Sequence, residues 1–217
     1  MRAIPKNANA NPNAKVYLTE TWARPDMVYG HLVTKADTTS PTGSPIPDGS
    51  GAKATLYYDS LAGMTADLRT TIYGEAARNG KFAGVIGAGD AFQLAFDQGL
   101  VRTSGFYDAS GVFVPNIDGV MNLWWDDYLH ASKYGSYLDA LVQFGTITGL
   151  DPRLLGGAEI AARDLGISVA NASTLQRVAA QQLGFVPEPG SVAMVALGLG
   201  LMGVTQLRRS KPVSASR

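Results

Sequence analysis

The sequence predicts an α/β fold, in the form of a three-layer α/β/α sandwich followed by one C-terminal transmembrane helix. Short apolar segments of strand length alternate along the chain with longer segments of helical periodicity, which is the pattern of α/β domains. About 185 residues precede the C-terminal apolar segment, enough for a single domain with a hydrophobic core.

The first strand and the first helix are predicted from residues 15–20 and 60–79. Residues 15–20, Lys-Val-Tyr-Leu-Thr-Glu, have the β-branched and aromatic content of a strand. Residues 60–79 have apolar side chains at helical spacing, and Gly80 is placed to end the helix. The apolar positions of this helix are Leu61, Met64, Leu68 and Ile72. The segment between them, 38–51, is rich in Thr, Ser, Pro and Gly and predicts a long surface loop.

A second strand and helix follow at residues 82–86 and 91–98. Phe-Ala-Gly-Val-Ile at 82–86 is a short apolar run suited to a buried strand, and Asp90 is a candidate N-cap for the helix. Gly87-Ala88-Gly89 does not complete a dinucleotide-binding fingerprint, because Phe92 stands where the third glycine would be. We therefore expect no cofactor at this turn.

The rest of the domain is predicted to be mainly helical. Residues 99–123 read as loop with a short strand, and residues 136–148 as a helix with an apolar face. Asp151-Pro152 predicts the start of a helix that continues to Leu165, and the last helix ends near Leu183.

Composition excludes several classes of function. Lys plus Arg and Asp plus Glu number 18 each, so the formal charge is zero, and no basic stripe indicates nucleic acid as a partner. The chain has no cysteine, which rules out disulfides and cysteine–zinc sites. Its two histidines, His31 and His130, argue against a histidine-rich metal site, and His31 is expected to be an exposed loop residue.

The C-terminal segment has the features of a short membrane anchor. The uncharged run 191–207 would span about 25 Å as a helix, close to a hydrocarbon core of about 30 Å. Pro187-Glu188-Pro189 precedes this run, and Arg208 and Arg209 follow it. The basic residues predict that the C-terminus is cytoplasmic and that the main domain lies outside. A buried C-terminal helix of a soluble domain is the alternative, but such a helix rarely lacks a polar face.

This order of triplet, apolar run and basic stop resembles the PEP-CTERM sorting signal over residues 186–211, with 212–217 as a tail. The resemblance implies export, anchoring in the bacterial inner membrane, and cleavage near the triplet by an exosortase-type enzyme, so that the protein reaches the cell surface or extracellular matrix. Such a protein is expected to begin with a signal peptide, yet residues 1–14 contain no apolar core segment.

The segment 124–138 is the densest candidate for chemistry. Asp127-x-x-His130 stands just before a predicted helix, and this spacing places both side chains on one side of a turn. A carboxylate that bonds one imidazole nitrogen leaves the other free as a base. Asp126 is a second candidate partner, although the spacing favours Asp127. Trp124 and Trp125 would either line a carbohydrate subsite or, as paired aromatics more often do, pack in the core.

Two segments resemble a known family: Asp127-x-x-His130 with the helix after it, and Glu20-Thr21-Trp22-Ala23-Arg24-Pro25-Asp26. Over residues 15–183 the chain resembles the SGNH (GDSL-type) hydrolases. The resemblance implies a flavodoxin-like α/β/α sandwich and hydrolysis of ester bonds on polysaccharide or small molecules. It assigns His130 as the general base and Asp127 as the residue that orients it. We accordingly divide the chain into a remnant at 1–14, a partial hydrolase-like domain at 15–185, the sorting signal and the tail.

The nucleophile of that family is not found in this sequence. Its serine lies in a Gly-Asp-Ser turn before the strand at Lys15, and no serine precedes that strand here. Ser132 is too close to His130 in the chain for attack geometry, and Ser60 and Ser104 lack the context of a nucleophile turn. We expect the chain to be the C-terminal part of a longer protein that has lost its first strand, to be inactive as an esterase alone, and to aggregate or stay molten as residues 1–186.

Other interpretations remain open on sequence grounds. One is a decayed, non-catalytic exported protein that binds or builds extracellular polysaccharide. In another, His130 has a purely structural role.

Overall fold

The computed structural model describes residues 13–40, 43–116 and 119–185 of the 217-residue chain. The chain separates into two compact units, Met1–Leu183 and Gly184–Arg217. Every helix and strand of the described residues belongs to the first unit. The division into domains that the sequence predicts stays a prediction.

The predicted membrane anchor lies outside the described residues. This holds for the apolar run 191–207 and for the sorting residues Pro187, Glu188, Pro189, Arg208 and Arg209. Within the described ranges, none of the helices combines the length and the apolar character needed to cross a bilayer.

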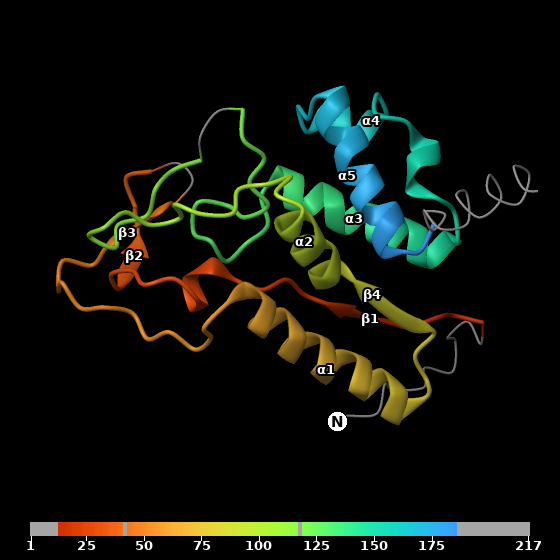
Figure 1. The fold of residues 1–217 in the computed structure, drawn as a ribbon, viewed down its shortest axis with the longest axis horizontal. Coiled ribbons are helices and arrows are strands. Elements are labelled where there is room, and N and C mark those ends of the chain that lie inside the picture. The colour runs from red at the N-terminus through yellow and green to blue at the C-terminus, as the bar shows by residue number, and fades with distance from the viewer. Residues whose placement is uncertain (1–12, 41–42, 117–118, 186–217) are drawn as a thin grey trace, which may run out of the picture. The chain divides into compact units, whose positions relative to one another are not determined.

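A pair of parallel strands forms the centre of the domain. β1 (Tyr17–Glu20) pairs with β4 (Gly84–Gly87), with Tyr17 opposite Gly84 and Glu20 opposite Gly87. Figure 1 shows α1 (Leu61–Asn79) on one side of this pair and the other long helices on the opposite side. The α/β class is thus confirmed, but the parallel sheet has only two strands in the described part of the chain. The wider sheet of an SGNH-type sandwich stays a prediction.

Helix α1 agrees with the helix predicted at 60–79, except that Ser60 is its N-cap and Leu61 its first residue. The side-chain oxygen of Ser60 accepts a hydrogen bond from the backbone nitrogen of Gly63 at 3.0 Å, which caps the first turn. Gly80 ends the helix in the left-handed region, at a φ of 62°. Leu61 and Met64, in the first turn of α1, are buried, and the Sδ of Met64 accepts from the backbone nitrogen of Arg24 at 3.3 Å.

Helix α2 (Ala88–Asp97) begins earlier than predicted, because no turn separates it from β4. Asp90 is therefore in the first helical turn and is not the N-cap. The carboxylate of Glu20, at the end of β1, accepts a hydrogen bond from the backbone nitrogen of Asp90 at 3.1 Å. Gly89 permits this approach, because a Cβ there would lie 2.3 Å from the backbone oxygen of Thr21.

The C-terminal half is helical, with two corrections to the predicted bounds. Helix α3 (Lys133–Thr148) begins three residues before the predicted start at 136, because Ser132 caps it. The helix predicted after Asp151-Pro152 divides into the 3-10 helix η2 (Pro152–Leu155) and the short α4 (Ile160–Asp164), interrupted at Gly156, where φ is 75°. Helix α5 (Val169–Gln182) packs against α2 and α3.

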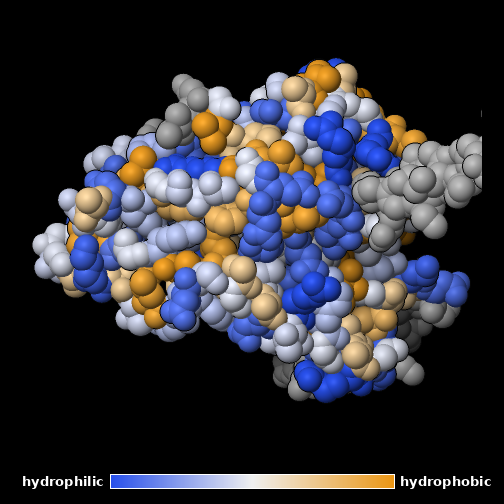
Figure 2. Space-filling view, viewed as in Figure 1, coloured by the Kyte–Doolittle hydropathy of each residue, from blue (hydrophilic) through white to orange (hydrophobic). Residues whose placement is uncertain are grey.

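Two short antiparallel strands lie around the predicted loop at 38–51. β2 (Thr34–Ala36) pairs with β3 (Pro45–Pro47), so part of that loop is a strand, contrary to the sequence prediction. A short 3-10 helix, η1 (Pro25–Met27), precedes them. In Figure 1 this hairpin lies at the opposite end of the first unit from α5. The face shown in Figure 2 carries hydrophobic side chains in several separate groups among hydrophilic ones.

The core extends beyond β1, β4 and their helices into the irregular segment between α2 and α3. Trp124, Phe106 and Tyr128 come from this segment and are each at most 2% exposed. The ring of Trp124 meets Phe106 edge-on, with centroids 5.6 Å apart, and Phe92 of α2 at 5.9 Å. This aromatic cluster fixes the segment that carries the candidate site.

Candidate functional site

A tight backbone turn presents the candidate site. Trp124 and Ala131 form a β-bridge at its base, and the backbone nitrogen of Trp125 donates to the carbonyl oxygen of His130 at 2.8 Å. The backbone nitrogen of Tyr128 donates to the carbonyl oxygen of Trp125 at 2.9 Å. Tyr128 has a φ of 55°, the one positive φ of a non-glycine residue in the described ranges. Because such a conformation is strained for a bulky side chain, surrounding contacts must maintain it.

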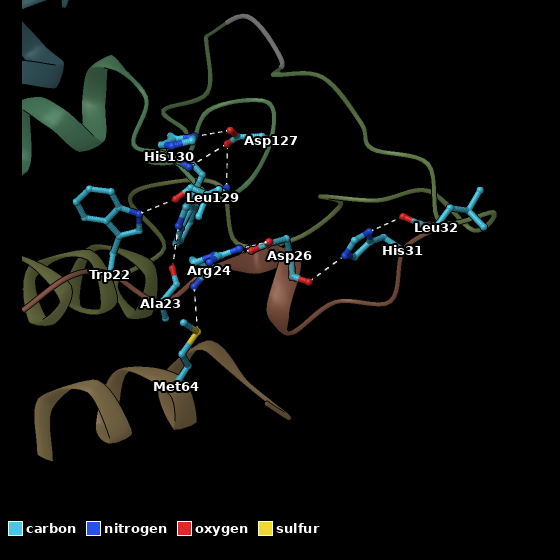
Figure 3. A network of polar contacts seen from close by, with 11 residues as sticks. Trp22, Ala23, Arg24, Asp26, His31, Leu32, Met64, Asp127, Leu129 and His130 are labelled. Carbon is cyan, nitrogen blue, oxygen red and sulfur yellow. Dashed lines mark hydrogen bonds and ion pairs between the residues drawn. The ribbon is translucent and has the colours of Figure 1, made fainter. Parts of the chain in front are cut away.

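The turn brings Asp127 and His130 into contact, as their spacing predicts (Figure 3). The Nδ1 of His130 lies 2.6 Å from one carboxylate oxygen of Asp127. The other oxygen accepts hydrogen bonds from the backbone nitrogens of Leu129 and His130, both at 2.9 Å. The His130 side chain is 73% exposed and that of Asp127 is 26% exposed. His130 Nε2 has no hydrogen-bond partner within the described residues, so it is open to a substrate or to solvent.

The environment of Asp127 keeps its carboxylate charged. Burial raises the pKa of Asp127, but the hydrogen bonds from the His130 ring and from two backbone nitrogens together outweigh it and hold this pKa below its ordinary value. The ionised Asp127 carboxylate accepts a hydrogen bond from the N–H group at Nδ1. The lone pair of the neutral imidazole is then on Nε2. Asp127, and not Asp126, is the partner of His130.

The segment that follows β1 holds this turn in place through hydrogen bonds. The indole nitrogen of Trp22 donates to the carbonyl oxygen of Leu129 at 3.0 Å (Figure 3). The indole nitrogen of Trp124 donates to the carbonyl oxygen of Ala23 at 2.9 Å. The ring of Trp22 also stacks on Phe92, with centroids 4.8 Å apart. The Asp127–His130 pair therefore lies beyond the carboxyl end of β1, the edge where α/β domains place their sites.

His31 belongs to the same supporting segment and is buried, contrary to the sequence prediction of an exposed loop residue. Its ring stacks on Tyr107 at 4.7 Å. The two ring nitrogens face carbonyl oxygens, Nε2 that of Asp26 at 2.9 Å and Nδ1 that of Leu32 at 2.7 Å. Asp26 also pairs with Arg24 through a hydrogen bond of 3.0 Å. His31 is thus held in the loop by its neighbours and is a structural residue.

Arg102 is a supporting residue that the sequence analysis missed. It is 6% exposed and donates to the hydroxyl oxygen of Tyr128 at 3.0 Å and to the carbonyl oxygens of Val114 and Pro115 at 3.1 Å each. Burial raises the pKa of Tyr128 to about 12, so its hydroxyl stays protonated and donates to the carbonyl oxygen of Val114. An isolated arginine in an irregular segment carries no sequence signal for this role.

The serines considered as nucleophiles have other roles. Ser132 is 5% exposed, donates its hydroxyl to the carbonyl oxygen of Asn122, and accepts from the backbone nitrogen of Tyr134 at 3.1 Å. Ser60 caps α1. No serine hydroxyl is hydrogen-bonded to His130 in the part of the chain that the structure describes. No cluster of three metal-ligating side chains occurs among those same residues.

Comparison with known families identifies the C-terminal segment. Residues 185–210 match the family described as the PEP-CTERM protein-sorting motif. The chain carries a PEP-CTERM sorting motif. This motif marks the protein for export, for anchoring in the membrane and sorting to the cell surface, and for processing by an exosortase. The match agrees with the predicted signal at 186–211 to within one residue at each end.

The main domain has no such counterpart. No curated protein and no solved structure matches the chain. The resemblance of residues 15–183 to SGNH hydrolases therefore has no support from a known relative. The structure shows that Asp127 and His130 are in contact. Their catalytic role stays a prediction.

Proposed function

We propose that the main domain of this exosortase-sorted protein contributes the acid–base half of an ester hydrolase site, with His130 as general base and Asp127 as the residue that orients it. The observation that carries the proposal is the 2.6 Å contact between Asp127 and His130 Nδ1, with Nε2 exposed and open. In ester hydrolysis, Nε2 would take the proton of an attacking hydroxyl and later return it to the leaving group. Asp127 would stabilise the imidazolium formed between these steps.

Ester hydrolysis by this pair also needs a nucleophile, which the described residues do not place beside His130. The sequence contains no Gly-Asp-Ser, and Ser132 uses its hydroxyl to cap α3. We therefore expect the 217-residue chain to show no ester hydrolysis that depends on His130. The substrate class, O-acyl esters on polysaccharide or small esters, follows from the SGNH resemblance.

The test supplies the missing half. A segment with a Gly-Asp-Ser turn from a working SGNH hydrolase is joined ahead of Lys15, and hydrolysis of p-nitrophenyl acetate is measured. We expect activity that falls about 10²- to 10⁴-fold in the His130→Ala variant, the usual effect of losing a general base. A chimera that unfolds cooperatively but hydrolyses no ester would refute the proposal, as would His130-dependent hydrolysis by the 217-residue chain.

A non-catalytic, polymer-binding exported protein is the second candidate. It is favoured by a pocket of about 230 Å³ beside the Asp127–His130 turn.

A further inference from the structure

A pocket of about 230 Å³ lies beside the Asp127–His130 turn, where the turn leads into α3. It is lined by side chains of the turn, of the start of α3 and of the preceding loop. The members that matter here are Asn116, Val120, Asn122, Trp125, Lys133 and Tyr134. It is smaller than the sites of about 300 to 1,000 Å³ that hold drug-sized molecules, so it suits one ring-sized group.

Two aromatic side chains give this pocket its apolar surface. Trp125 is 38% exposed, whereas its neighbour Trp124 is 2% exposed and belongs to the core. Tyr134 lies one residue into α3, and the ammonium of Lys133 lies 5.2 Å from the centre of its ring. Trp124 makes the aromatic contacts of the core, whereas Trp125 presents part of its indole to the pocket.

Hydrogen-bond donors surround these rings. Within the described residues, the indole nitrogen of Trp125 and the hydroxyl of Tyr134 have no partner. The amide oxygen of Asn116 accepts from the side chain of Asn122, which leaves the amide nitrogen of Asn116 as a donor. Lys133 donates to the carbonyl oxygen of Gly166 at 3.0 Å and retains further N–H groups.

This combination restricts the chemistry of the ligand. A purely apolar ligand would cover the donors and leave them unpaired, which costs binding free energy. A sugar ring satisfies both features, because its C–H face packs on an aromatic ring while its hydroxyl and ring oxygens accept hydrogen bonds around the rim. We propose that the pocket formed around Trp125 and Tyr134 binds a carbohydrate ring.

The pocket is separate from the catalytic proposal, because its ligand needs no nucleophile. It shares with the Asp127–His130 pair only the backbone of the turn, where Trp125 is hydrogen-bonded to His130. Carbohydrate binding would therefore persist in a His130→Ala variant, whether or not that residue acts as a base.

The experiment is a titration of the full chain, in detergent micelles, with glucose, galactose, mannose and N-acetylglucosamine, followed by the indole N–H resonance of Trp125. We expect at least one sugar to shift this resonance saturably, with a dissociation constant on the order of millimolar for a ligand of about a dozen heavy atoms. Trp125→Ala and Asn116→Ala should each weaken binding, the former by about tenfold or more. Because Trp125 is lost in its own variant, binding there is measured by calorimetry.

The matched control is Tyr57→Ala, which removes an aromatic side chain that is 68% exposed and lies outside the lining. It should bind like the wild type, and so should His130→Ala. Absence of a saturable shift with all four sugars would overturn the proposal. Equal affinity in Trp125→Ala, or saturable binding of phenol but of no sugar, would overturn it too.

Discussion

The indole nitrogen of Trp22 donates a hydrogen bond to the carbonyl oxygen of Leu129, across 107 residues of sequence, at 3.0 Å. Leu129 stands between Asp127 and His130, so this bond ties the candidate acid–base turn to the segment that follows β1. Together with the hydrogen bond from Trp124 to Ala23, it attaches the region of the turn to this segment at two points. The site's geometry thus depends on contacts that no local sequence pattern encodes.

Trp22→Phe isolates that bond, since the phenyl ring retains the stacking on Phe92. The variant leaves the carbonyl oxygen of Leu129 without its donor, and we expect the free energy of unfolding to fall by about 0.5 to 1.5 kcal/mol. Denaturant unfolding of the full chain in detergent micelles measures this loss. Trp125→Phe is the matched control and should cost less, because its indole nitrogen has no partner in the described residues. Equal losses in the two variants would contradict this role of Trp22.

Asp127→Asn tests which nitrogen of His130 carries the proton. The asparagine can still accept from the backbone of the turn, but its amide group can also donate to Nδ1. We expect nitrogen NMR to show the neutral ring protonated at Nδ1 in the wild type and at Nε2 in the variant. In the chimera that carries a nucleophile, this loss of the base nitrogen should lower hydrolysis by up to about 10⁴-fold. The same tautomer in both chains would argue against an orienting role for Asp127.

The carboxylate of Asp127 also makes stability depend on acid pH. Its folded-state pKa is depressed, so the stabilisation is present above the ordinary value of 3.8 and is lost as the pH falls through the lower folded value. Asp127→Asn should therefore flatten the acid limb of the unfolding curve. Thermal unfolding of both chains over the acid range checks this.

Glu20 predicts the opposite dependence. Burial, and then the charge of Asp90, raises the pKa of Glu20 from 4.5 to about 7, and one of its carboxylate oxygens has no hydrogen-bond partner in the described part of the chain. The folded state therefore holds a proton that the unfolded state releases, and stability is lost as the pH rises from 4.5 to about 7. We expect Glu20→Gln to be more stable than the wild type by up to about 3 kcal/mol at pH about 8, with little difference below pH about 5. A gain that is independent of pH would point to some other cause.

Arg102 should be the most sensitive position behind the site. Arg102→Met keeps much of the apolar stem but removes the donors to Tyr128, Val114 and Pro115. Losing these hydrogen bonds from a buried, charged donor should cost at least about 2 kcal/mol and release the strained backbone of Tyr128. Unfolding measurements and the His130 ring resonances report the two effects. Arg177→Met, on an exposed part of α5, is the control and should change neither.

The sorting motif predicts a processing defect. Glu188→Ala, within the matched residues 185–210, should leave the uncleaved chain in the membrane fraction of cells that express the exosortase. Immunoblots of membrane and surface fractions measure the ratio. Pro212→Ala, outside the match, should be processed normally. Unchanged processing of both variants would show that the Pro-Glu-Pro triplet is not what the exosortase reads.

Local signals predicted much of the fold. The apolar spacing over 60–79 predicted α1, and Gly80 marked its end, because both signals are encoded locally in the sequence. The three-residue spacing of Asp127 and His130 predicted their contact, because both residues lie in one local turn. The triplet, apolar run and basic stop predicted the sorting motif, since each part is contiguous in sequence.

Contacts between distant segments account for the errors. Asp90 looked like a helix cap, but Glu20, 70 residues earlier, caps α2 in its place. His31 read as an exposed loop residue because the ring that covers it, Tyr107, lies far along the chain. The strand at Pro45–Pro47 was missed because prolines count against strands, although they are tolerated at their edges.

The most direct test of the proposed function is the rate of p-nitrophenyl acetate hydrolysis by the chimera that carries a Gly-Asp-Ser segment ahead of Lys15, with and without His130→Ala. If Asp127 and His130 form an acid–base pair, the parent chimera hydrolyses the ester and the variant loses about 10²- to 10⁴-fold in rate. Equal rates in two chimeras that both unfold cooperatively would contradict a catalytic His130.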